Sequence, residues 1–170
     1  MLHGRRSVLS LLAPLAVSIT GIVALSVALP APSALAQAAP VGTPIAAGYG
    51  AGTIPGIKAQ IIINAPGHYY LTQNLTVPSE NHGIYINAGR VTLDLSGLAI
   101  NGQGGSLFGV YVADAQGKPR PSVTIENGTI SGMGYAGIFA YNVAGGTIRD
   151  IQVAGCNTDG WRCSTCKRPS

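Results

Sequence analysis

The chain has 170 residues, which is the length of one domain. Only 9% of the residues are charged, 46% are hydrophobic and 24 are glycine, a composition that argues against a helical bundle and against a disordered chain. The formal net charge is +4, but Arg5 and Arg6 lie in a targeting segment, and without these two the remaining eight basic residues face six acids. A balance of +2 with no basic stripe predicts that the protein does not bind nucleic acid.

Residues 1–36 are predicted to be an export signal. The Arg5–Arg6 pair gives a basic start, residues 7–29 carry no charge, and a small-x-small site predicts cleavage between Ala36 and Gln37. The arginine pair resembles a bacterial twin-arginine signal, and an ordinary Sec signal fits equally well. A retained membrane anchor is the alternative, because the apolar run is long enough to span a bilayer. We expect a secreted, periplasmic or cell-surface protein with no membrane contact after cleavage.

The body of the chain repeats one plan. Residues 37–56 are rich in Ala, Gly and Pro without a period, which predicts an irregular lead-in. Within residues 57–155, similar copies begin at Gly83, Gly109 and Gly137. Each copy has a glycine, a strand-like triplet, a polar turn, a strand with Thr and an aliphatic residue, and a third short strand. Recurrence of such a unit every 20 to 30 residues, roughly, is typical of a solenoid.

Aligning the copies predicts columns of equivalent residues. The columns are Leu93, Ile125 and Ile148; Thr92, Thr124 and Thr147; Leu98, Gly128 and Ile151; and Ile100, Ile130 and Val153. A weaker upstream copy is expected to place Leu71, Leu75 and Val77 in the three aliphatic columns, which makes about four coils. Alternation within the strands predicts that Leu93 points inward and that Thr92 and Asp94 point outward.

These segments carry a resemblance to a known superfamily. The stretches GHYYLTQNLTV, VTLDLSG and VTIENGTISG resemble the opening coils of right-handed parallel β-helix proteins of the pectate-lyase-like kind, over roughly residues 54–155. The resemblance implies an all-β, right-handed parallel β-helix. It says little about activity, because such coils occur in lyases, hydrolases, epimerases and non-catalytic surface proteins.

One outward column combines charged residues. Asp94, Glu126 and Arg149 should occupy successive coils about 4.8 Å apart, where two carboxylates could hold Ca²⁺ or raise one carboxyl pKa for acid catalysis. The resemblance implies calcium and a basic proton acceptor for lyases, or clustered aspartates for hydrolases. This sequence lacks the aspartate pairs, and the lyase segments normally lie in later coils. The alternative is a solvated ladder in which Glu126 pairs weakly with Arg149.

Two longer turns interrupt the repeats, at residues 103–108 and 115–121. Long turns on one side of a solenoid commonly bind ligands, and Lys118 and Arg120 would offer positive charge to an acidic sugar. The alternative is an ordinary solvated loop. His68 and His82 lie beside glycines and are interpreted as surface turn residues.

The pattern fails in residues 156–170, which we expect to be irregular. Cys163 and Cys166, with Cys156, could hold zinc or form a disulfide, although a lone CxxC lacks the second pair of a persuasive zinc site. A solenoid needs a cap, so we expect an oligomer or missing C-terminal coils to cover the open end. A frameshift near residues 156–161 would produce such a change in the sequence pattern.

Two hypotheses of function follow. The first is an exported protein of the pectate-lyase-like kind that binds or cleaves an acidic polysaccharide; as an enzyme it would be a polysaccharide lyase or glycoside hydrolase, with calcium as a possible cofactor. The second is a non-catalytic, adhesin-like surface or structural solenoid, because acids and histidines are scarce in the coils.

Overall fold

The computed structural model describes residues 40–158 and 160–164, which form strands joined by turns. The strands are β1 (Thr43–Ile45), β2 (Ala59–Ile63), β3 (Gly67–Leu71), β4 (Leu75–Val77), β5 (His82–Ile86), β6 (Val91–Asp94), β7 (Ala99–Gly102), β8 (Val110–Val112), β9 (Arg120–Ser131), β10 (Ile138–Tyr141), β11 (Val143–Ala154) and β12 (Trp161–Ser164). None of these residues belongs to a helix long and apolar enough to cross a bilayer.

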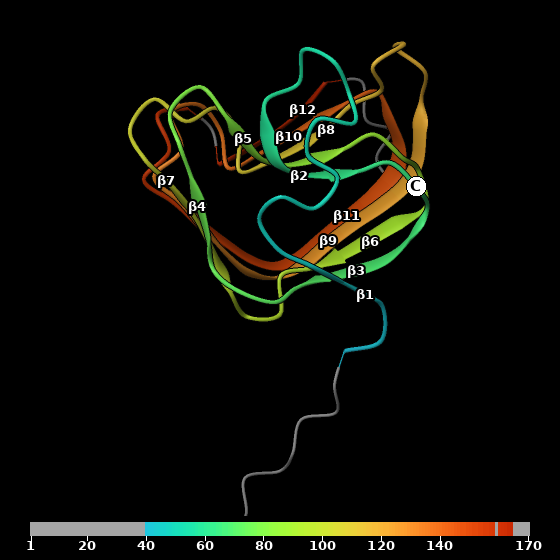
Figure 1. Ribbon diagram of the computed structural model, residues 1–170, viewed down its shortest axis with the longest axis horizontal. Helices are drawn as coiled ribbons and strands as arrows, with labels where there is room; N and C mark the ends of the chain where they lie inside the picture. Colours follow the sequence, from blue (N-terminus) through green and yellow to red (C-terminus); the bar gives the residue numbers. More distant parts are fainter. Residues whose placement is uncertain (1–39, 159, 165–170) are drawn as a thin grey trace, which may run out of the picture. The chain divides into compact units, whose positions relative to one another are not determined.

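Successive turns stack so that the strands form three faces around the interior, and the paired strands within each face are parallel (Figure 1). One face holds β2, β5, β8, β10 and β12, one strand from each turn. A second face holds β1, β3, β6 and the first parts of β9 and β11, and the third holds β4, β7 and the second parts of β9 and β11. The predicted all-β, right-handed parallel β-helix is thus confirmed, with about five turns where the sequence predicted about four. The difference arises at the ends, because β1 and β12 lie in segments expected to be irregular.

The strand register confirms three of the four predicted columns in full. Each of these three sets is in register: Thr92, Thr124 and Thr147; Leu93, Ile125 and Ile148; and Ile100, Ile130 and Val153. In the fourth column, Ile151 lies beside Gly128. The upstream copy is the exception, because Tyr69 and not Leu71 lies beside Leu93, and Leu75 lies beside Ile100. Tyr69 fits the apolar column because its hydroxyl leaves the core and donates a hydrogen bond to the Ala65 carbonyl at 2.9 Å.

The glycines that open each repeat are needed for close stacking. A Cβ on Gly83 would lie 2.4 Å from the carbonyl oxygen of Gly109, and a Cβ on Gly109 would lie 2.7 Å from that of Gly137. Real Cβ atoms do not approach a carbonyl so closely, so any side chain would push the turns apart. The repeated Gly in the sequence therefore marks a column in which backbone packs on backbone.

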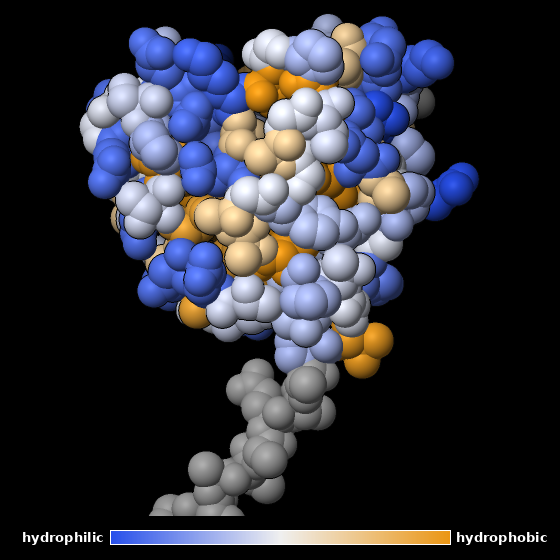
Figure 2. Space-filling view, viewed as in Figure 1, coloured by the Kyte–Doolittle hydropathy of each residue, from blue (hydrophilic) through white to orange (hydrophobic). Residues whose placement is uncertain are grey.

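The lead-in segment covers the first turn. The amide of Gly48 donates to the carbonyl of Gln60 at 2.7 Å, and the amide of Ile62 donates to the carbonyl of Tyr49 at 2.8 Å. Ile54 and Ile57 pack against a small apolar cluster that includes Ile62 of β2. Figure 2 shows this end of the stack, with a pale to orange middle and a mostly blue rim. Pairing and apolar contact thus protect the edge of β2.

The corner between the second and third faces changes length from turn to turn. Four residues separate Asp94 from Ala99, at positions 95–98, whereas two separate Glu126 from Thr129. Asp94 still pairs with Glu126, and Ala99 still pairs with Thr129. The register of both faces is therefore independent of the corner's length.

Candidate functional site

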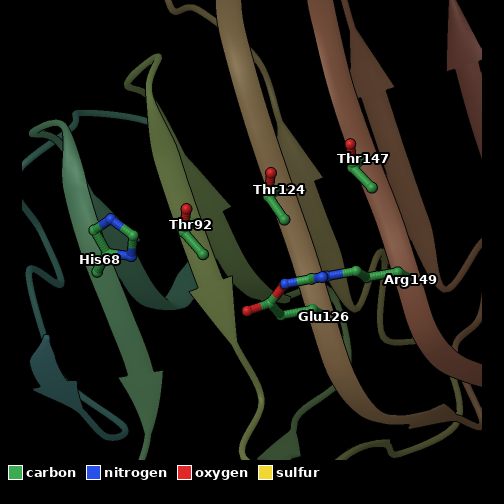
Figure 3. A pocket seen from close by; sticks show the side chains of 6 residues that line it. All are labelled: His68, Thr92, Thr124, Glu126, Thr147 and Arg149. Carbon is green, nitrogen blue, oxygen red and sulfur yellow. The ribbon is translucent and has the colours of Figure 1, made fainter. Parts of the chain in front are cut away.

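A shallow groove of about 320 Å³ runs across the outer face of β3, β6, β9 and β11. Its lining side chains are His68, Thr92, Thr124, Thr147, Glu126 and Arg149 (Figure 3). They face outward because alternate residues of each strand, such as Leu93 and Ile125, point into the core. Parallel register then brings equivalent residues of successive turns together.

Three threonines form the floor of the groove. Thr92, Thr124 and Thr147 are in register on adjacent strands, at the strand spacing of about 4.8 Å, and Figure 3 shows their hydroxyls pointing the same way. Within the described part of the chain, none of the three hydroxyls has a protein hydrogen-bond partner. Each can therefore donate and accept a hydrogen bond with a ligand.

Glu126 and Arg149 close one side of the groove. The Arg149 side chain reaches from β11 to β9 and places Nε at 2.6 Å and one terminal nitrogen at 2.5 Å from Glu126 Oε2. The Glu126 side chain is 16% exposed and that of Arg149 is 62% exposed. Both contacts are to a single carboxylate oxygen, so Oε1 remains available as an acceptor.

Asp94 shares the predicted column, but its carboxylate serves the corner. Asp94 pairs with Glu126 in the sheet, as Glu126 does with Arg149. Asp94 Oδ1 accepts hydrogen bonds from the Ser96 amide at 2.6 Å and from Asn127 Nδ2 at 3.1 Å. No group of three or more His, Cys, Asp or Glu side chains among the described residues could hold a metal ion. The catalytic and calcium-binding roles of Asp94 and Glu126 stay predictions.

The basic residues of the 115–121 loop lie outside the groove lining. Lys118 is exposed. Arg120 is half-buried, forms an ion pair with the buried carboxylate of Asp114, and donates a hydrogen bond to Asn87 Oδ1 at 2.9 Å. Arg120 thus ties the loop to the body, and substrate binding by Lys118 and Arg120 stays a prediction.

An aromatic cluster on the outer side of the five-stranded face was not predicted. His82 is only 8% exposed, and its ring stacks on Phe108 at 5.4 Å and 5° and lies 4.8 Å from Tyr111. The interpretation of His82 as a surface residue is therefore wrong, and burial lowers its pKa from 6.5 to about 4. The signal in the sequence that could have predicted its burial is the pair of aromatic residues in the next repeat, Phe108 and Tyr111. His68, in contrast, is exposed at the groove, although it lies in β3 and not in a turn.

Several predicted features lie outside the described residues. They are the export signal, the cleavage site between Ala36 and Gln37, Cys166 and the side chain of Cys163. Cys156 is a free, partly buried thiol.

Comparisons with known proteins add no family. No protein-family model matches the chain, and no curated protein or solved structure gives a significant match. The similarity to pectate-lyase-like proteins therefore rests on the parallel β-helix alone, which many functions share.

Proposed function

We propose that the protein binds a polysaccharide along the groove lined by Thr92, Thr124 and Thr147, called here the threonine groove, and does not cleave it. The observation that carries this proposal is the row of three hydroxyls without protein partners among the described residues, at Thr92, Thr124 and Thr147, beside the Glu126–Arg149 ion pair. A polymer of hydroxyl-bearing units can repeat its hydrogen bonds along such a row. Export of the chain, predicted from residues 1–36, would bring it to extracellular glycans.

The chemistry of the groove suits sugars. Threonine hydroxyls donate and accept, Glu126 Oε1 accepts, and the exposed guanidinium of Arg149 donates in a planar fork. A guanidinium also binds carboxylates strongly, which extends the range of ligands to uronates. Neutral and acidic polysaccharides are thus both compatible with the groove.

Binding is favoured over cleavage because the two carboxylates are engaged. General acid catalysis needs a carboxyl group that can hold and release a proton at the scissile bond. Glu126 is paired with Arg149, and Asp94 Oδ1 accepts two hydrogen bonds at the corner. This arrangement also favours the non-catalytic, adhesin-like alternative. In the present proposal, the ligand of such a surface protein is a polysaccharide.

Affinity electrophoresis in gels that contain polygalacturonate, alginate or a neutral glucan tests the proposal. We expect retardation of the wild-type protein by at least one polymer, and about threefold to tenfold weaker binding after Thr124→Val, which removes one hydroxyl but keeps the shape. Thr76→Val is the matched control, because Thr76 is an exposed strand residue of another face.

Two results would contradict the proposal. Equal retardation of the Thr124→Val and Thr76→Val variants would move binding away from the groove. Release of unsaturated uronate or new reducing ends by the wild type, lost in Glu126→Gln, would show that the groove cleaves its ligand.

A further inference from the structure

The charged groups at the threonine groove do not balance. Glu126 and Arg149 belong to the lining, and Asp94 lies beside Glu126 on the next strand, in the same outward column. These two carboxylates and one guanidinium leave one negative charge. Arg90 and Asp150 are exposed at the neighbouring corners, outside the lining, and their opposite charges cancel.

The guanidinium of Arg149 is already paired. Figure 3 shows its side chain crossing to β9, where Nε lies 2.6 Å and one terminal nitrogen lies 2.5 Å from Glu126 Oε2. No basic side chain among the described residues forms an ion pair with Asp94. Asp94 Oδ1 accepts its two hydrogen bonds from neutral donors, the Ser96 amide and Asn127 Nδ2. The two carboxylates therefore share one positive charge.

An acidic sugar over the threonines would add a third carboxylate to this group. It can bind the remaining N–H groups of Arg149, but it then shares the same positive charge with Glu126. It can instead displace Glu126, whose side chain is only 16% exposed and would lose its cation. Adjacent strands are about 4.8 Å apart, so the repulsion from Asp94 acts at close range. A neutral sugar meets the same hydroxyl and N–H groups without this repulsion.

We propose that the threonine groove takes a neutral polysaccharide, and that the carboxylate of Asp94 discriminates against polymers of acidic sugars. This inference rests on the binding function proposed above and names the class of its ligand. Asp94 lies outside the groove lining, so it determines specificity through its charge and not through contact with the sugar. Repulsion of the wrong ligand is a common source of specificity.

Affinity electrophoresis with matched pairs of polymers tests the inference. Carboxymethyl and hydroxyethyl cellulose share one backbone and differ in charge, as do polygalacturonate and its methyl ester. The gels are run near pH 8, roughly, where histidine side chains are uncharged, and at about 0.01 M salt, where the Debye length is about 30 Å. We expect the neutral member of a pair to retard the wild type about threefold more, or better, than the acidic member.

Asp94→Asn isolates the charge. Asparagine keeps an Oδ1 that accepts both hydrogen bonds at the corner, so circular dichroism should show an unchanged fold. Retardation by the acidic polymers should rise about threefold, and retardation by the neutral polymers should stay the same. Glu80→Gln is the matched control, because it removes the same charge from an exposed ion pair with Lys58 outside the groove lining and should change neither.

The outcomes separate this inference from the proposed function. Stronger retardation of the wild type by the acidic members, reduced by Thr124→Val and by added salt, would overturn the inference and keep binding in the groove. Equal retardation of the wild type and Asp94→Asn by the acidic polymers would overturn the role of Asp94. No retardation by any polymer would contradict the proposed function, and the inference with it.

Discussion

The buried imidazole of His82 makes the protein sensitive to acid. The folded pKa of His82 is about 4, against 6.5 for the free side chain, because the ring is desolvated between Phe108 and Tyr111. The unfolded chain therefore binds a proton at a pH where the folded chain does not. The stabilisation is complete above pH 6.5 and is lost as the pH falls toward about 4.

The difference between the two pKa values corresponds to about 3 kcal/mol of unfolding free energy. His82→Phe keeps an aromatic ring in the stack and removes the titration, so its stability should fall less on acidification than that of the wild type. Urea unfolding at neutral pH and near pH 4 gives the loss of unfolding free energy on acidification for the wild type and for His82→Phe. Subtracting one loss from the other removes the contribution of the carboxylates, which the two proteins share. His68→Phe is the control, because His68 is exposed. Parallel pH profiles for the wild type and His82→Phe would refute the reasoning.

Three further changes test the packing of the body. Ile125→Ala should cost about 2 to 5 kcal/mol in urea unfolding and Ile125→Val about 0.5 to 1.5, because the residue is 2% exposed; equal costs would contradict cavity formation. Gly128→Ala should cost about 1 to 3 kcal/mol, since its Cβ would lie 2.5 Å from a Cβ of the preceding turn, whereas Gly104→Ala meets nothing within 4 Å and should lower the thermal midpoint far less. Arg120→Ala should cost about 3 to 5 kcal/mol, because it leaves the Asp114 carboxylate buried at 2% exposure without its cation; a change below 1 kcal/mol, roughly, would show that the carboxylate finds water instead.

Local alternation was sufficient to predict the repeating part of the fold. Val, Thr and Leu alternate in β6, and Val, Thr and Ile alternate in β9, so the inward and outward faces followed from the side-chain period, and the register followed from aligning the repeated copies. The Glu126–Arg149 pair followed as well, because it needs only adjacent turns in register.

Features that depend on contacts between turns could not be read from one segment. His82 has glycine beside it, which suggests a turn, but its burial comes from Phe108 and Tyr111 of the next turn. Tyr69 is polar at one end, yet it occupies an aliphatic column because its hydroxyl reaches a carbonyl outside the core. The partners of His82 come from the next turn, whereas the carbonyl that accepts the Tyr69 hydrogen bond belongs to Ala65, four residues earlier in the chain.

The corner that follows β6 tells where this scaffold accepts extra chain. Its residues 95–98 are twice as many as the pair at positions 127 and 128 in the next turn, and the strands on both sides keep their partners. Ser96 and Gly97 adopt left-handed backbone there, and the amide of Leu98 donates a hydrogen bond to the carbonyl of Leu95 at 2.8 Å, so the corner forms a closed turn. A peptide inserted between these two residues would extend from this corner, next to the strands that carry the threonine groove. The corner is therefore a position at which extra residues can be added while the strands keep their register.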